Sequence, residues 1–175
     1  NLPTNYIQGI FDAPSIKNPD FYAMRVATTI LRDRVFEEVR AKRNLSYAPS
    51  ADMGLLAANT GNIYVTAVDA NQAISVMLNE INSLKTTVVD DRDISGVTGQ
   101  FLTTYFIGQE TNAAQAAELA RYELIGGGWR NAFEFLNRVK QVTSADVQKV
   151  SQKYMKNLRF VVLGKPEYIN RQIFL

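Results

Sequence analysis

Two groups of carboxylates are the first residues whose types and spacing could support catalysis. Glu37 and Glu38 are adjacent, and Asp90, Asp91 and Asp93 form a second group. Two carboxylates can divide the work of general acid and general base, as they do in glycosidases. Adjacent residues on a helix point in different directions, however, and negative charge is favoured at a helix N-terminus, where we place the aspartates. We therefore interpret both groups as surface and helix-capping residues.

A run of three glycines, residues 126–128, could approach a phosphate group closely. It lacks the Lys-Ser/Thr pair and the preceding strand of a phosphate-binding loop, so we predict that it ends one helix and links it to the next. Trp129, Phe133 and Phe135 follow this run. We interpret these aromatic residues as core or helix-packing residues, since this role is more common than a binding platform.

The residues that are missing restrict the remaining chemistry. The 175-residue chain contains no histidine and no cysteine. Ser-His-Asp chemistry, histidine general bases and the usual catalytic zinc sites therefore lose their central residue, and disulfides and thiolate sites are excluded. No recognisable nucleophile motif favours an independent enzyme based on Ser-Lys or carboxylate chemistry. We expect no catalytic and no metal-binding residue in this chain.

The overall charge does not indicate a polyanionic partner. Lysine and arginine number 19 against 17 acidic residues, for a net charge of +2, and only Arg40, Lys42 and Arg43 form a basic group. This is too weak a basic footprint for nucleic acid. No stretch of about 18 apolar residues predicts a membrane span. The chain begins at Asn1 without a Met, which suggests a processed protein or a piece cut from a longer one.

Hydrophobic periodicity and capping signals predict a single α+β domain over residues 1–175. We expect an antiparallel-rich β-sheet packed on one face by several α-helices, with the last strand pairing with strands near the beginning. A helix should start at Asn18-Pro19, Asp69 should cap the next long helix, and Thr143 with Asp146 should form a capping box. The expected strands are 6–11, 46–56, 61–68 and 158–163, and the expected helices are 20–31, 34–43, 69–85, 91–108, 113–124, 130–139 and 144–155.

One constellation stands above this background, in the segment RVFEEVRAKRNLSY at residues 34–47. It predicts a helix, a tight turn and a strand. A second segment, VTSADVQKVSQKY at 142–154, is followed by LRFVVLGKP at 158–166, and the middle of the chain carries AAQAAELARYELIG at 113–126. Together these segments resemble the non-catalytic C-terminal domain of the insulinase and pitrilysin (M16) family of zinc metallopeptidases, whose fold is of the LuxS-like metallohydrolase type. The resemblance covers nearly the whole sequence.

The resemblance implies a two-part enzyme. Family members pair two such domains around a closed chamber that encloses peptides, and the active domain carries an inverted zinc motif, HxxEH, on the helix after its first strand. The corresponding helix here, DFYAMRVATTIL at 20–31, contains neither His nor Glu. Zinc is therefore expected only in an HxxEH-bearing catalytic domain or subunit, and this chain is not expected to be an enzyme on its own. One departure from the family is that residues 30–33 run directly into Arg34, without a Gly-rich turn.

The same resemblance assigns Arg40 and Tyr47 as substrate-binding residues. In the inactive domains of the family, an arginine and a tyrosine at this interval reach the substrate backbone near the scissile bond. A guanidinium can donate paired, charge-assisted hydrogen bonds to peptide carbonyls, and a phenol can donate one toward the charge developing on a tetrahedral intermediate. Both roles need a scaffold and no reactive group.

Two hypotheses of different classes follow from this resemblance. In the first, the chain is the substrate-binding half of a zinc metalloendopeptidase. In the second, it is a purely structural scaffold resembling the core proteins of respiratory complexes. Retention of Arg40 and Tyr47 favours the first. A bacterial periplasm or cell envelope is the preferred location, and an apolar face left open by a missing partner would allow a homodimer.

Overall fold

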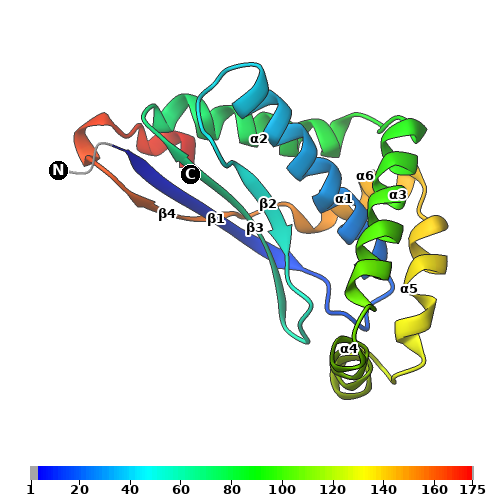
Figure 1. The fold of residues 1–175 in the computed structure, drawn as a ribbon. Helices are drawn as coiled ribbons and strands as arrows, with labels where there is room; N and C mark the ends of the chain where they lie inside the picture. Colours follow the sequence, from blue (N-terminus) through cyan, green and yellow to red (C-terminus); the bar gives the residue numbers. More distant parts are fainter. Residues whose placement is uncertain (1–3, 175) are drawn as a thin grey trace.

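The computed structural model describes residues 4–174 as one layer of β-sheet covered on one face by helices (Figure 1). The strands are β1 (Asn5–Ala13), β2 (Ser50–Met53), β3 (Asn59–Ala67) and β4 (Arg159–Leu163). The α-helices are α1 (Asp20–Val35), α2 (Ala70–Thr86), α3 (Asp91–Gly108), α4 (Asn112–Ile125), α5 (Asn131–Lys140) and α6 (Ser144–Tyr154). A π-helix, η1 (Phe36–Ala41), extends α1, and two short 3-10 helices, η2 (Pro166–Tyr168) and η3 (Arg171–Phe174), follow β4. The predicted α+β class is confirmed.

The four strands form an antiparallel sheet in the order β2-β3-β1-β4. The last strand pairs with the first, with Tyr6 opposite Leu163, as predicted. Burial alternates along β1 and β3, because successive side chains of a strand point to opposite faces. One face, which includes Ile7, Phe11 and Ile63, packs against the helices, while the other carries the exposed side chains of Tyr6 and Val161 and is not covered by any element within residues 4–174.

α1 is the central helix of the packed layer. It contacts β2, α2, α3, α5 and α6, and eleven of its sixteen residues are buried. Phe21, Met24, Ala27, Thr28 and Leu31 recur at helical spacing and are all buried, but burial extends around the helix and is not confined to this stripe. A helix that is apolar nearly all round belongs inside a core.

Two boundaries differ from the sequence prediction. The helical pieces expected at 20–31 and 34–43 form one continuous rod, α1 running directly into η1, since no helix breaker lies between them. The strand expected at 46–56 is confined to Ser50–Met53. Pro49 explains the late start, because proline has no N–H to donate to a sheet ladder and restricts the residue before it.

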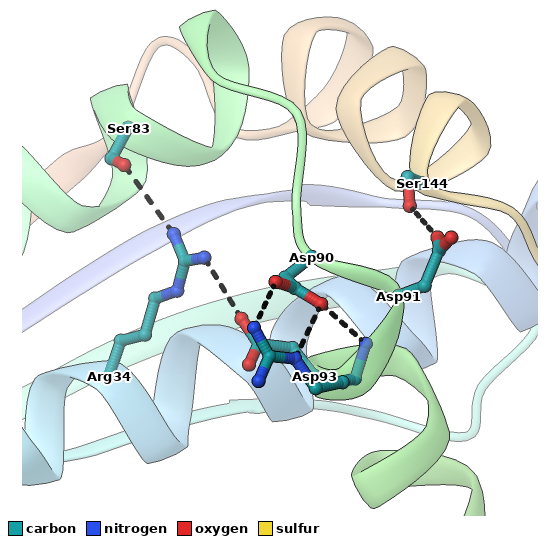
Figure 2. Close-up of polar contacts among 7 residues, drawn as sticks. Arg34, Ser83, Asp90, Asp91, Asp93 and Ser144 are labelled. Carbon is teal, nitrogen blue, oxygen red and sulfur yellow. Dashed lines mark hydrogen bonds and ion pairs between the residues drawn. The ribbon is translucent and has the colours of Figure 1, made fainter.

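The carboxylates considered as a catalytic group lie at helix ends, as predicted. Asp90 caps α3 by accepting a hydrogen bond from the Arg92 N–H at 2.8 Å. Asp91 accepts a 2.8 Å hydrogen bond from Ser144 of α6, and Arg34 reaches from α1 to Asp93 of α3 at 3.3 Å; Figure 2 draws both contacts. Arg34 also donates a hydrogen bond to Ser83 of α2 at 3.4 Å, so these contacts join four helices, and among them no pair of carboxylates faces each other across a cleft.

The glycine run is the predicted helix stop. Gly126 ends α4, and Gly127 and Gly128 follow with φ of +81° and +114°, a region that side-chain-bearing residues rarely adopt. Phe135 contacts the rings of Tyr22 and Phe101, as expected for a packing residue.

The prediction was wrong for the other two aromatic residues of this segment. Trp129 and Phe133 pack edge to face on each other but are 40% and 56% exposed. Trp129 lies just before the short helix α5 and Phe133 lies in its first turn, so their spacing reflects a local pair and not a core stripe.

α6 begins with the predicted capping box. The Thr143 hydroxyl accepts from the Asp146 N–H at 3.2 Å, and the Asp146 carboxylate accepts from the Thr143 N–H at 3.0 Å. We expect Thr143→Ala to lower the free energy of unfolding by about 1 kcal/mol, because it leaves a helix-end donor without its partner. Urea denaturation followed by circular dichroism measures this change. Thr103→Ala, in the middle of exposed α3, is the matched control; an equal loss there would show that the cap makes no special contribution.

Asp146 also makes stability depend on pH. The hydrogen bond from the Thr143 side chain, followed by that from its backbone, lowers the pKa of Asp146 below its ordinary value of 3.8. Its stabilising contribution is therefore present above that value and lost as the pH falls through the lower, folded-state pKa. Between about pH 6 and pH 2, Asp146→Asn should lose less unfolding free energy than the unaltered chain. Identical losses in parallel denaturant titrations would contradict this assignment.

Candidate functional site

The end of the α1 rod positions Arg40. η1 continues α1 with wider turns, in which the Lys42 N–H donates to the Glu37 carbonyl, five residues back. Such π-turns are rare in proteins overall, but those that do occur are often found at functional sites. Val39 is fully buried and anchors the segment, while Phe36 and Arg40 remain on its accessible side. The rod therefore fixes Arg40 at the edge of the core with its side chain accessible.

The basic group around Arg40 is divided by Glu38. The Glu38 carboxylate pairs with Lys42 at 2.5 Å and with Arg43, and these hydrogen bonds, that of Lys42 first, lower the pKa of Glu38. Arg43 also donates to the Glu38 carbonyl at 2.9 Å. Within residues 4–174, no carboxylate pairs with Arg40. Of the three cations, Arg40 is the one left for a ligand.

The structure brings Arg40 and Tyr47 into contact. The guanidinium carbon of Arg40 lies 4.2 Å from the centroid of the Tyr47 ring and 5.0 Å from that of Phe36. Stacking of this kind uses the face of the guanidinium and leaves its N–H groups, which point outward in the plane, available as donors. The two rings thus restrict the orientation of the guanidinium, while its in-plane N–H groups remain free to donate hydrogen bonds.

A tight turn returns the chain from η1 to Tyr47. Asn44 adopts a left-handed φ of +51°, and the Leu45 N–H donates to the Val39 carbonyl at 2.9 Å, which closes the helix end. Tyr47 lies in the loop before β2 and not in the strand that we expected, and it is 79% exposed. The exposed ring leans on Arg40 and leaves the phenol hydroxyl accessible.

A hollow of about 570 Å³ lies beside this pair. Its walls come from the 44–48 turn and from the end of β3, including Leu45, Thr66 and Val68, and Arg40 is the one charged residue that lines it. The Ser46 hydroxyl, also in the wall, is buried and has no hydrogen-bond partner among the described residues. The site can therefore offer hydrogen-bond donors to an uncharged or anionic group lying against an apolar wall.

Sequence reasoning missed two parts of this site. Phe36 stacks on Arg40 from four residues away, and an aromatic residue four positions from an arginine on a helix is a signal that could have revealed it. The wall formed by residues 66–68 comes from the end of β3 and the residue after it, which are distant in sequence from Arg40 and are placed by pairing with β1.

The residues of α1 do not fit a zinc ion. The carboxylates of this helix are Asp20 and Asp33, at opposite ends, and Asp20 is already bonded to Lys153 and Tyr154 of α6. The rest of the helix offers arginines, hydroxyls and buried apolar side chains. Throughout residues 4–174 there is no group of three or more His, Cys, Asp or Glu residues that could hold a metal ion. In the same part of the chain, the helices lack the length and apolar character that a bilayer crossing requires.

Known proteins resemble this chain in sequence and in fold. A zinc protease from Streptomyces coelicolor, itself uncharacterised, is 26% identical over 141 residues, which are 75% of this chain and 30% of that protein. The chain thus spans less than a third of this relative's length.

Solved structures share the fold at low sequence identity. The inactive peptidase domain of a Bordetella parapertussis protein named as a zinc protease has a TM-score of 0.81 at 18% identity, covering 91% of this chain and 92% of that one. A Helicobacter pylori protease gives 0.84 at 13% identity, covering 94% of this chain and 42% of that one. A chain of complex III from Candida albicans gives a TM-score of 0.75 at 16% identity, covering 93% of this chain and 42% of that one.

The family model matches more than half of the sequence. It is described as the peptidase M16 inactive domain, and residues 1–101 match it, a stretch that includes β1, the α1 rod, Arg40, Tyr47 and all of β3. The chain belongs to the inactive-domain family of the M16 peptidases.

Proposed function

We propose that this chain is the non-catalytic, substrate-binding half of a zinc metalloendopeptidase, with Arg40 and Tyr47 as the residues that hold the peptide. The observation that carries the proposal is the stacked pair itself. An arginine without a carboxylate partner, held between two rings next to a hollow, is arranged to bind something outside the chain.

Each side chain has a distinct role in this proposal. The free N–H groups of Arg40 donate to carbonyl oxygens of an extended peptide, and their fixed plane lowers the entropy lost on binding. The Tyr47 hydroxyl donates to the carbonyl oxygen on which charge develops during attack by water. The apolar wall of the hollow contacts a neighbouring side chain of the substrate. No group of this chain abstracts a proton or attacks the peptide.

The catalytic chemistry belongs to a partner in this proposal. An HxxEH-bearing M16 domain, in the same polypeptide or as a separate subunit, holds the zinc that activates the attacking water. The name of the Streptomyces coelicolor relative and the 42% coverage of the Helicobacter pylori protease support a second domain of this kind. A periplasmic or envelope location remains a part of the proposal.

A scaffold role is the second candidate, and one observation favours it. The fold is shared with a chain of complex III from Candida albicans, so a domain of this shape also occurs in a respiratory assembly. In that role the open face of the sheet packs against neighbouring subunits, and Arg40 and Tyr47 need no ligand.

The test mixes this chain with its HxxEH-bearing partner and follows cleavage of an internally quenched fluorescent peptide. We expect Arg40→Ala to lower kcat/KM by about 10- to 100-fold, since a charge-assisted hydrogen bond contributes roughly 1.5–3 kcal/mol. Tyr47→Phe should lower kcat more than it raises KM, because the phenol acts mainly as charge develops.

Arg130→Ala is the matched control for this experiment. Arg130 also stacks on an aromatic ring, that of Trp129 at 4.5 Å, but lies on the loop before α5, outside the site. Rates for Arg40→Ala and Tyr47→Phe equal to that of Arg130→Ala would favour the scaffold role. Cleavage by this chain alone would contradict both candidate functions.

A further inference from the structure

A second hollow, of about 370 Å³, lies among α1, α3, α4 and α5, where these helices gather at one end of the molecule (Figure 1). Arg25 lines it from the N-terminal half of α1, roughly 20 Å along the rod from Arg40 at 1.5 Å per residue. Leu55, Phe101 and Phe135 form apolar walls. A volume of this size, mostly apolar with a few converging polar groups, is typical of a small-ligand site.

Arg25 has few hydrogen-bond and ion-pair partners for a guanidinium in a mostly apolar hollow. Its guanidinium donates one hydrogen bond, from Nη1 to the Met53 carbonyl at 3.2 Å, while its Nε is buried without a partner. Its other neighbour is the Phe101 ring, with a centroid 5.6 Å away. Burial lowers the pKa of Arg25, and the charge of Asp52 opposes this only from a distance, since the two form no ion pair. A buried charge without a counterion is costly, so the site favours an anion.

The other charged groups at the hollow leave a positive balance. Arg121 of α4 lines it, and no carboxylate of residues 4–174 pairs with either arginine. Glu118 is the one acidic side chain in the lining, and its carboxylate already accepts a hydrogen bond from the Gln109 amide. Two cations thus face one carboxylate that is already engaged.

Tyr122 adds a neutral donor to this site. It is buried in the wall of the hollow, and burial raises the pKa of its hydroxyl, which therefore stays protonated at neutral pH. A protonated phenol beside a guanidinium can donate to the same anionic group. The apolar walls then require that the rest of the ligand be hydrophobic.

We propose that this hollow binds an amphipathic carboxylate, with its charged group at Arg25 and its apolar group against Phe101 and Phe135. The C-terminal residue of an apolar peptide and a free fatty acid share this chemistry. The site is separate from the Arg40 and Tyr47 pair and does not depend on the function proposed for that pair.

Isothermal titration calorimetry with the 175-residue chain tests the proposal with three probes. These are the tripeptide Ala-Leu-Phe with a free C-terminus, the same peptide with a C-terminal amide, and decanoate. We expect the free peptide acid or decanoate to bind at least tenfold more tightly than the amide. Preference for the peptide acid identifies a peptide terminus as the ligand, and preference for decanoate identifies a fatty acid. Equal binding of acid and amide, or no binding by any probe, overturns the proposal.

Two variants and one spectrum locate the binding. Arg25→Met should remove the preference for the acid, and Ala117→Leu should block the hollow without touching the arginine, whereas Arg130→Met should bind as the unaltered chain does. Amide chemical shifts of Gly108 and Ala114, which line the hollow, should move on titration of the unaltered chain. This readout stands even if a variant fails to fold. Unchanged shifts at these two residues during binding would place the ligand elsewhere and contradict the site.

Discussion

The burial of α1 on nearly all sides is the constraint on which the rest of the structure depends. The sheet covers the helix on one side, and α2, α3, α5 and α6 cover most of the remainder. Such a helix can carry charged residues only at its ends or where its flank reaches a cavity. Asp20 lies at one end, Arg25 reaches the hollow among the helices, and Arg34 reaches the polar network of α3. The positions of the functional candidates follow from this restriction.

The same constraint explains why this domain is a binding partner and not a catalyst in the proposal. A metal site needs several polar ligands converging on a point that water or substrate can reach. Phe21, Met24, Val26 and Leu31, all fully buried, fill the space around α1 with packed apolar side chains instead. The C-terminal end of the rod, η1, remains accessible, and it carries Arg40.

Much of the fold could be predicted because local signals and tertiary packing agree. The Ile74, Met77 and Ile81 stripe of α2 and the Thr143 capping box each depend on residues within a few positions of one another. Arg40 and Tyr47 could also be expected to lie near each other, since only six residues, which include one tight turn, separate them. The wall at 66–68, the hollow around Arg25 and the exposure of Trp129 could not, because each depends on which distant elements become neighbours.

The small number of buried residues in α4 affects which part of the domain unfolds locally with the least free energy. Only Tyr122 of this helix is buried, and its packing is mainly against α5, while α1 and the sheet are held from many directions. Segments with few buried apolar contacts open with less free energy than the core, as cooperative units of their own. We therefore expect the α4 region to unfold locally with less free energy than the rest of the domain. Opening of α4 would expose the hollow that this helix lines, while the contacts of α1 with β2, α2 and α6 do not involve it.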